Sequence, residues 1–137
     1  MPMSADVSAD ALTYYFTGDT LVIPRPSARY VALHKADPGR TGVNEVTTGD
    51  DANYARQVAT FTVGDSNADN IFEDTNDADV VFAAAAGGSS YTVAFVSVWD
   101  AVSGGNMLAY LPLAVSVPVV ASTIVNLAAG DILIKGV

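Results

Sequence analysis

The sequence predicts a mainly β protein, a single-domain antiparallel β-sandwich over residues 1–137, with jelly-roll connectivity as one candidate topology. Three observations predict this class. Apolar residues alternate with polar or small residues in many short runs, which is the period of two that strands show. Turn signals built on glycine, asparagine and aspartate separate these runs. Half of the 137 residues are hydrophobic, which is enough to bury a core in a chain of this length.

One short helix is expected before the strands. It covers residues 9–16, with Ser8 as its N-cap and Gly18 just past its end. The first strand is expected over Ala28–His34, where apolar and β-branched residues follow a proline-rich entry. A turn-rich loop runs from Asp37 to Asp51. Its length predicts that it is functional or packs on a neighbour.

The other strands are expected beyond residue 54. Ala59, Phe61 and Val63 alternate with threonines, which predicts one continuous strand with one buried face. Tyr91–Trp99 is apolar on both faces, so we expect a central strand that is covered on both sides. The remaining expected strands are short and apolar: Val80–Ala84, Met107–Leu111, Val115–Val120, Thr123–Leu127 and Asp131–Lys135.

Composition excludes several classes of function. Fifteen acidic and six basic residues give a net charge of -9, which repels phosphate backbones and anionic lipids, so neither nucleic acid nor a membrane is expected as a partner. Without cysteine there are no disulfides, thiolate metal sites or thiol nucleophiles. Residues 101–130 carry no charge, but Pro112, Pro118 and the alternating valines are typical of strands and not of a membrane helix. Residues 1–10 hold two acids and no base, so no secretory signal is expected.

No catalytic residue and no cofactor is expected, and we predict that the protein is not an enzyme. The one histidine, His34, lies in a predicted strand, where a structural role is the usual one. The sequence contains no G-x-S-x-G motif, no Walker A loop and no G-x-G-x-x-G motif.

The acidic segment Asp65–Asn76 is the one candidate for a metal site. Its alternating side chains fall at positions 1, 3, 5, 7 and 9 of an EF-hand loop: Asp65, Asn67, Asp69, Ile71 and Glu73. Asn70 stands where such loops have glycine, and Asn76 cannot supply the bidentate carboxylate of position 12. We therefore expect a solvated acidic loop and no metal site, with weak calcium binding as the alternative.

Basic residues are unevenly distributed along the chain. Five of the six lie between residues 25 and 56: Arg25, Arg29, Lys35, Arg40 and Arg56. A basic patch on an acidic protein could dock on an acidic partner or on a neighbouring copy, and we predict a partner contact here. The alternative is a set of separate solvated side chains with local salt bridges.

Several motifs together point to a family. They are Tyr30–Gly39 (YVALHKADPG), Thr41-Gly42, Asn44–Val46, Tyr54–Gln57 (YARQ), Trp99-Asp100, Gly104–Leu108 (GGNML) and Ala128–Asp131 (AAGD). This pattern resembles small virion proteins of tailed bacteriophages, which are usually described as tail-fibre or virion structural proteins. The resemblance covers nearly the whole chain and departs at Gly49–Asn53 and over the acidic residues Asp65–Asp79. It implies a non-enzymatic structural protein and brings no catalytic residues.

Two placements in the virion are compatible with this resemblance. The leading interpretation is a capsid decoration or cement protein that stabilises the head, lies on the capsid surface and contacts other virion proteins, above all the major capsid protein. A chain of this length lacks the long repetitive stalk of a fibre. The alternative is a tail-fibre or receptor-binding module that recognises a glycan. Aromatic side chains could then stack on sugar rings: Trp99, Tyr91, Tyr54 and Tyr110. Of these, Trp99 is expected in the core.

A homo-oligomer, with a trimer as the first choice, is predicted from the excess of apolar strand surface. Tyr91–Trp99 and Leu111–Val120 each offer two apolar faces, whereas a lone sandwich buries one face of each strand. Another surface is therefore expected to cover the second face.

Overall fold

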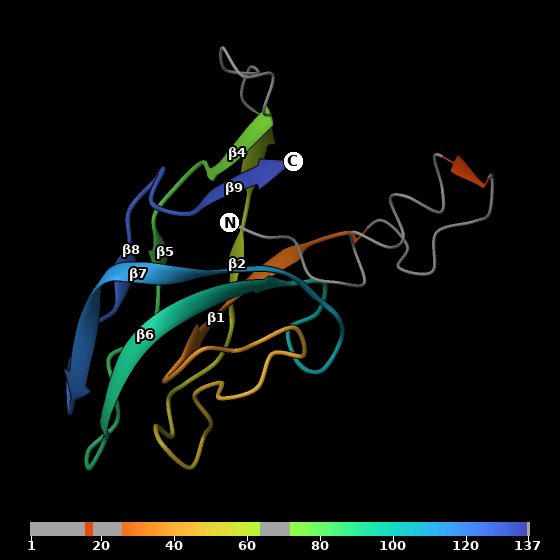
Figure 1. Cartoon of the computed structure of the whole chain (residues 1–137). Helices are drawn as coiled ribbons and strands as arrows, with labels where there is room; N and C mark the ends of the chain where they lie inside the picture. The colour runs from red at the N-terminus through yellow and green to blue at the C-terminus, as the bar shows by residue number, and fades with distance from the viewer. Residues whose placement is uncertain (1–15, 18–25, 64–71, 137) are drawn as a thin grey trace.

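The computed structural model describes residues 16–17, 26–63 and 72–136, and within them the chain forms three antiparallel sheets (Figure 1). A four-stranded sheet has the order β2-β1-β6-β7, a three-stranded sheet the order β3-β4-β9, and a two-stranded sheet pairs β5 with β8. The strands are β1 Arg29–His34, β2 Gln57–Ala59, β3 Phe61–Val63, β4 Phe72–Asn76, β5 Val80–Val81, β6 Ser90–Trp99, β7 Met107–Val120, β8 Asn126–Leu127 and β9 Leu133–Gly136.

The predicted fold class is confirmed, because the described residues are mainly β and every strand pair is antiparallel. Within the described ranges the sheets stay open and form no closed barrel. Jelly-roll connectivity stays a prediction. Of the helix expected over residues 9–16, only Phe16 is described, and most of the acidic segment Asp65–Asn76 also lies outside the described residues. The described part contains no helix long and apolar enough to cross a membrane.

The main hydrophobic core lies on one face of the four-stranded sheet. Side chains of β1 and β6 that share this face, such as Leu33 and Val96, are almost completely buried. They pack in one cluster with Val80 of β5 and Leu127 of β8, and Phe61 of β3 packs against that cluster. All three sheets therefore contribute to the same core. As predicted, Tyr91–Trp99 is central, because β6 lies between β1 and β7.

The single strand predicted around residues 59–63 is instead two strands. β2 pairs with β1 in the large sheet, and β3 pairs with β4 in the three-stranded sheet. The chain changes sheets at Thr60, whose carbonyl oxygen accepts a hydrogen bond of 2.9 Å from the amide of Asp77. Alternation of side chains indicates an extended backbone, but it does not show which neighbour each residue pairs with.

The two strands predicted at Met107–Leu111 and Val115–Val120 are one strand of 14 residues, β7. Pro112 pairs with Phe95 and Val117 with Val93, so the stretch between these pairs is longer on β7 and bulges away from β6. β7 forms an edge of its sheet, where a proline does not interrupt a ladder with a further strand. This edge position explains why Pro112 and Pro118 do not end the strand.

A second, smaller cluster lies on the opposite face of the four-stranded sheet. Ala32, Trp99 and Met107 are buried there, and Tyr110 packs against them. The structure thus confirms that Trp99, which is 6% exposed, belongs to a core. Part of the cover comes from the chain itself, because the loop after β1 brings Gly42 against the Trp99 ring. Around Trp99, the second apolar face of β6 is therefore covered in part by the chain's own loop.

Candidate functional site

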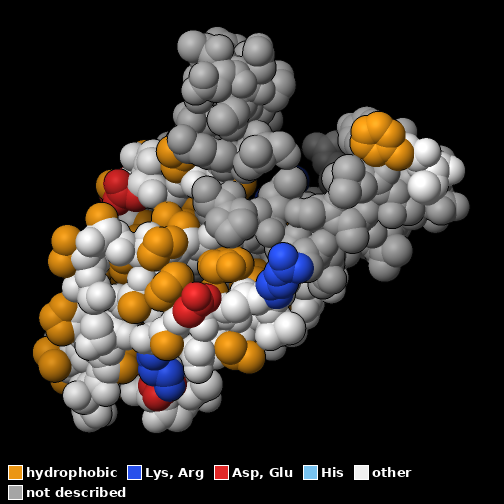
Figure 2. Space-filling view, viewed as in Figure 1, with side chains coloured by type: hydrophobic (Ala, Val, Ile, Leu, Met, Phe, Trp, Pro, Cys, Tyr) orange, Lys and Arg blue, Asp and Glu red, His pale blue; other side chains and the backbone are white. Residues whose placement is uncertain are grey.

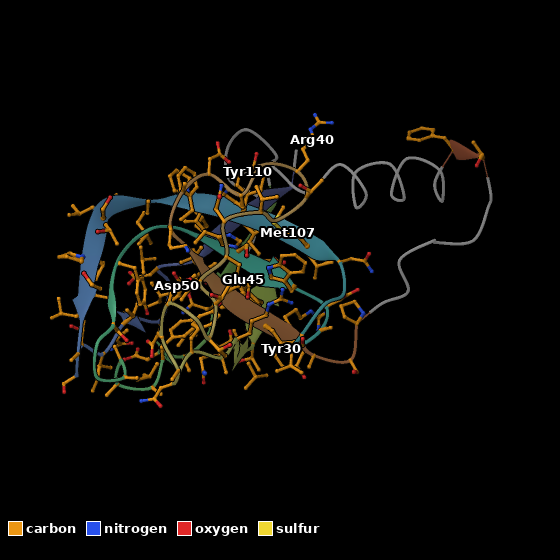
Figure 3. The ribbon with its side chains drawn as sticks, turned by 90° about the horizontal axis from the view of Figure 1, so that it is seen from below. Tyr30, Arg40, Glu45, Asp50, Met107 and Tyr110 are labelled. Atoms are coloured by element: carbon orange, nitrogen blue, oxygen red, sulfur yellow. The ribbon has the colours of Figure 1, made fainter. Side chains whose placement is uncertain are left out.

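Of the five basic residues that the sequence groups together, the four that the structure describes have different environments. Arg25 lies outside the described residues, and Arg29 is half-buried on β1. Lys35 is paired with Asp50 at 2.9 Å. Arg40 is exposed and points away from the ribbon (Figure 3). Arg56 is only 9% exposed and lies inside the chain's own contacts. The partner contact predicted for these five residues stays a prediction.

Arg56, directly before β2, joins three segments that are distant in the sequence. Its Nε and Nη2 donate to Oε1 and Oε2 of Glu45 at 2.8 and 2.7 Å. Its Nη1 donates to the carbonyl oxygens of Ala101 and Gly104, in the loop between β6 and β7, at 2.9 and 2.8 Å. The guanidinium carbon lies 3.8 Å from the centre of the Trp99 ring, close enough for a cation–π contact. We call Arg56, Glu45 and Tyr54 the arginine junction.

Tyr54 completes the arginine junction at the edge of β1. Its hydroxyl donates to Glu45 Oε1 at 3.0 Å and accepts a bond of 3.1 Å from the amide of Leu33. β2 pairs with β1 only as far as Val31, while the amide of Val46 bonds to the carbonyl oxygen of Leu33 at 2.9 Å. The Tyr54 hydroxyl therefore satisfies an edge amide that lies between these two pairings.

The pKa values of Glu45 and Tyr54 in the arginine junction both lie far from 7. Burial acts to raise the pKa of Glu45, but the hydrogen bonds and charge of Arg56 outweigh it and lower that pKa below its ordinary value. Burial, followed by the Glu45 charge, raises the pKa of Tyr54, so its hydroxyl keeps the proton that it donates. A shallow hollow of about 370 Å³ lies over Glu45 and Arg56. Because neither Glu45 nor Tyr54 titrates near pH 7, they are unsuited to acid–base catalysis there.

His34 has the structural role that the sequence predicts. It is fully buried, and its Nδ1 lies 2.9 Å from the carbonyl oxygen of Val43. A carbonyl oxygen only accepts, so Nδ1 carries the proton of the neutral ring. Ser97 then donates to Nε2 at 2.6 Å and accepts from Trp99 Nε1 at 2.6 Å. All three polar side chains are thus satisfied within the chain.

The segment Gly49–Asn53, where the sequence departs from the phage pattern, contains a buried carboxylate. Asp51, which is 4% exposed, accepts hydrogen bonds from the amides of Asn53 and Ala86 at 3.0 and 2.9 Å. Its other oxygen accepts from the hydroxyl of Tyr91 at 3.0 Å. Asp51 therefore fixes this loop to the turn before β6.

An open apolar groove runs beside β7. Its volume is about 570 Å³. It is lined by Leu111–Val115 and Val117 of β7, by Ile124–Leu127, and by Val96, Asp131 and Ile132. Apolar side chains cover much of the surface over β7 and β8, where charged side chains are sparse (Figure 2). We call this surface the β7 groove.

Comparison with known proteins decides the family. Residues 2–135 match the model of a family described as podophage GP4 fiber I protein gp80. The chain belongs to this family. No curated protein matches it. The match confirms the prediction of a bacteriophage virion structural protein. Between the two predicted placements, it fits the tail-fibre alternative better than the leading interpretation, capsid decoration.

In this fibre-family protein, none of the four aromatic residues proposed for stacking on sugars is exposed. The Trp99 ring is covered by Arg56 and by Gly42. Tyr54 stacks on Phe82 with ring centres 6.2 Å apart, and Tyr110 packs in the Trp99 cluster. These contacts help to hold the fold together, and stacking of the four residues on sugar rings stays a prediction.

In this member of the fibre family, the sequence predicts an excess of apolar surface on Leu111–Val120 but not the β7 groove itself. The groove also needs residues 124–132, which only the tertiary structure brings beside β7. Among the described residues, no group of three or more His, Asp or Glu side chains could hold a metal ion.

Proposed function

We propose that this chain is a non-enzymatic component of the podophage tail fibre. The observation that carries the proposal is the family match, which extends over residues 2–135 and names a fiber protein. It replaces our leading interpretation of a capsid cement protein. A short chain is compatible with a fibre when the chain is one building block of it.

The structure supports a scaffold role. Three side chains of types that often take part in catalysis are buried and hydrogen-bonded within the chain: His34, Asp51 and Arg56. Their bonds connect loops to the large sheet, so they add rigidity where an enzyme would keep a reactive group accessible. A rigid β domain whose loops are hydrogen-bonded to its sheet suits a structural component of a fibre.

Locating the protein in intact particles tests the proposal. A short epitope inserted between Gly87 and Gly88 should be tolerated, because both residues lie in an exposed turn and the space beside them is open. Phage that carry the tagged protein are then labelled with gold-conjugated antibody, with untagged phage as the control. We expect label on the tail. Label distributed over the head would overturn the proposal and restore the cement interpretation.

A further inference from the structure

The edge formed by β7 differs from the rest of this acidic protein. The chain carries a net charge of -9, yet no residue from 101 to 130 is charged. β7 supplies the free edge of the large sheet within this stretch. Exposed edges usually carry charges that prevent association. The charge-free surface is therefore a place where another molecule can approach without desolvating a charged side chain.

The β7 groove gives this edge a shape that another molecule can fill. Its inner wall reaches residues of the main core, including Val96 and Ile132, each 1% exposed. Its margin carries Val115 and Ile124, which are 78% and 58% exposed. Apolar projections and an apolar depression thus lie on the same surface. Such a surface can be self-complementary, since a projection of one copy can enter the depression of another.

The distribution of charge favours a second copy of this chain as the occupant over a basic partner. Two molecules of charge -9 repel each other over most of their surfaces, and contact is least unfavourable where both lack charge. Asp131 is the one charged residue among those that line the groove. A basic partner would have only this single carboxylate to recognise, whereas an identical copy presents a matching apolar face.

The contact is made by side chains and not by an added strand. Pro112 and Pro118 lack the amide hydrogen that a continuous ladder needs, and the bulge between them interrupts the regular pleat. Val115 lies in that bulge and projects into solvent. These features block strand addition and leave apolar packing available.

We propose that a second copy of this chain docks against the β7 groove, with Val115 and Ile124 buried in the contact. This inference concerns the isolated protein and does not depend on where the protein lies in the virion. A monomeric protein that is nevertheless found in the tail would refute this interface alone.

Sedimentation velocity of the full chain over a micromolar concentration series tests the interface. We expect wild type to associate, and Val115→Asp and Ile124→Asp each to weaken association by about tenfold or more, because each buries a carboxylate in an apolar contact. Val58→Asp is the matched control. Val58 is a valine that is 64% exposed on β2, at the opposite edge of the same sheet, and its variant should associate like wild type.

Circular dichroism of each variant verifies that the fold is retained. Both Val115 and Ile124 are exposed, so either variant serves if the other fails to fold. A monomeric wild type overturns the proposal and leaves the groove to a different virion protein. The proposal is also overturned if Val58→Asp weakens association as much as Val115→Asp and Ile124→Asp do.

Discussion

The sequence groups Arg56 with basic residues that could contact a partner, but its side chain is buried and makes contacts inside the protein. Removing a guanidinium and a carboxylate from water costs several kcal/mol for each ion. Here the cost is offset by two bonds to Glu45, two bonds to carbonyl oxygens of the β6–β7 loop and the Trp99 ring. Removal of the Arg56 side chain would leave the partly buried Glu45 carboxylate without its ion-pair partner, with only the Tyr54 hydroxyl still donating to it.

Replacing Arg56 should therefore destabilise the protein strongly. We expect Arg56→Ala to lower the free energy of unfolding by about 3 kcal/mol, as breaking a buried ion pair does. Arg56→Lys should lie between this variant and wild type, because an ammonium cannot bond to both Glu45 oxygens and the loop carbonyls. Urea denaturation measures the change. The control, Arg40→Ala, alters an exposed arginine and should stay within about 0.5 kcal/mol of wild type. Equal losses in Arg56→Ala and Arg40→Ala would refute this account.

His34 should make stability depend on pH near neutrality. Burial lowers its pKa, and the Arg56 charge acts in the same direction, while the bond to Val43 and the Glu45 charge partly oppose them. The folded protein thus binds a proton on this ring at lower pH than the unfolded chain does. Where the unfolded chain binds more protons, stability rises with pH. Acidification through about pH 6.5, the ordinary histidine value, should therefore destabilise the fold.

The measurement is the urea midpoint between about pH 7.5 and pH 5.5, where His34 dominates because Glu45 and Asp51 have lowered pKa values and stay charged. Wild type should lose stability across this range. His34→Gln has no group that titrates there and should show a flatter profile, although it is less stable overall. A wild-type profile as flat as that of His34→Gln would show that His34 has the same pKa in the folded and unfolded states and would refute this prediction.

At the scale of elements, the loop after β1 acts as a cover for the second cluster. It returns along β1, with the amide of Lys35 bonded to the carbonyl oxygen of Asn44 at 3.0 Å. The carbonyl oxygen of Pro38 accepts bonds from the amides of Gly42 and Val43, each 3.0 Å, which close the turn. Gly42 has a φ of 76° and leaves no room for a Cβ beside the Trp99 ring. Only glycine satisfies both conditions at this position.

Two glycines of this loop form a matched pair for testing the cover. Gly39 also has positive φ, 58°, but has nothing near the position of a Cβ. Gly39→Ala should cost about 1 kcal/mol from backbone strain alone. Gly42→Ala should cost about 1–3 kcal/mol more, because the Trp99 ring or the loop must move. Trp99 is the single tryptophan, so its fluorescence should shift to longer wavelength only in Gly42→Ala. Equal losses and unshifted spectra in both variants would refute the tight packing.

At the scale of the whole molecule, the excess of acidic residues determines which surfaces of two copies can come into contact. The self-association proposed at the β7 groove joins two molecules of the same charge through a face without charges. Salt screens the repulsion between the copies and does not weaken apolar contacts. The predicted contact through Arg29, Lys35 and Arg40 would respond in the opposite way, because salt weakens attraction between opposite charges.

We therefore expect the association constant of the wild type to rise with salt concentration. Sedimentation velocity at low and high sodium chloride measures it, with Val115→Asp as a variant that should remain weakly associated at both. Association that weakens as salt rises would identify the basic residues, and not the β7 groove, as the contact between copies.

The sequence by itself determined the features that depend on local chemistry. The apolar and β-branched residues of Ala28–His34 predict the strand β1, and the apolar residues on both faces of Tyr91–Trp99 predict the central place of β6. The structural role of His34 and the burial of Trp99 also follow from their apolar neighbours. The motifs from Tyr30 to Asp131 indicate a phage virion protein, because they can be compared without knowledge of the fold.

Only the tertiary structure decided which residues meet. Arg56 is grouped with other bases in the sequence, but its burial depends on Glu45 and on carbonyl groups far along the chain. The change of sheet at Thr60, the continuous strand through Pro112 and the edge position of β7 depend on partners in other strands. The side-chain period is a property of neighbouring residues, whereas strand order, register and the burial of a charge are set by contacts between distant ones.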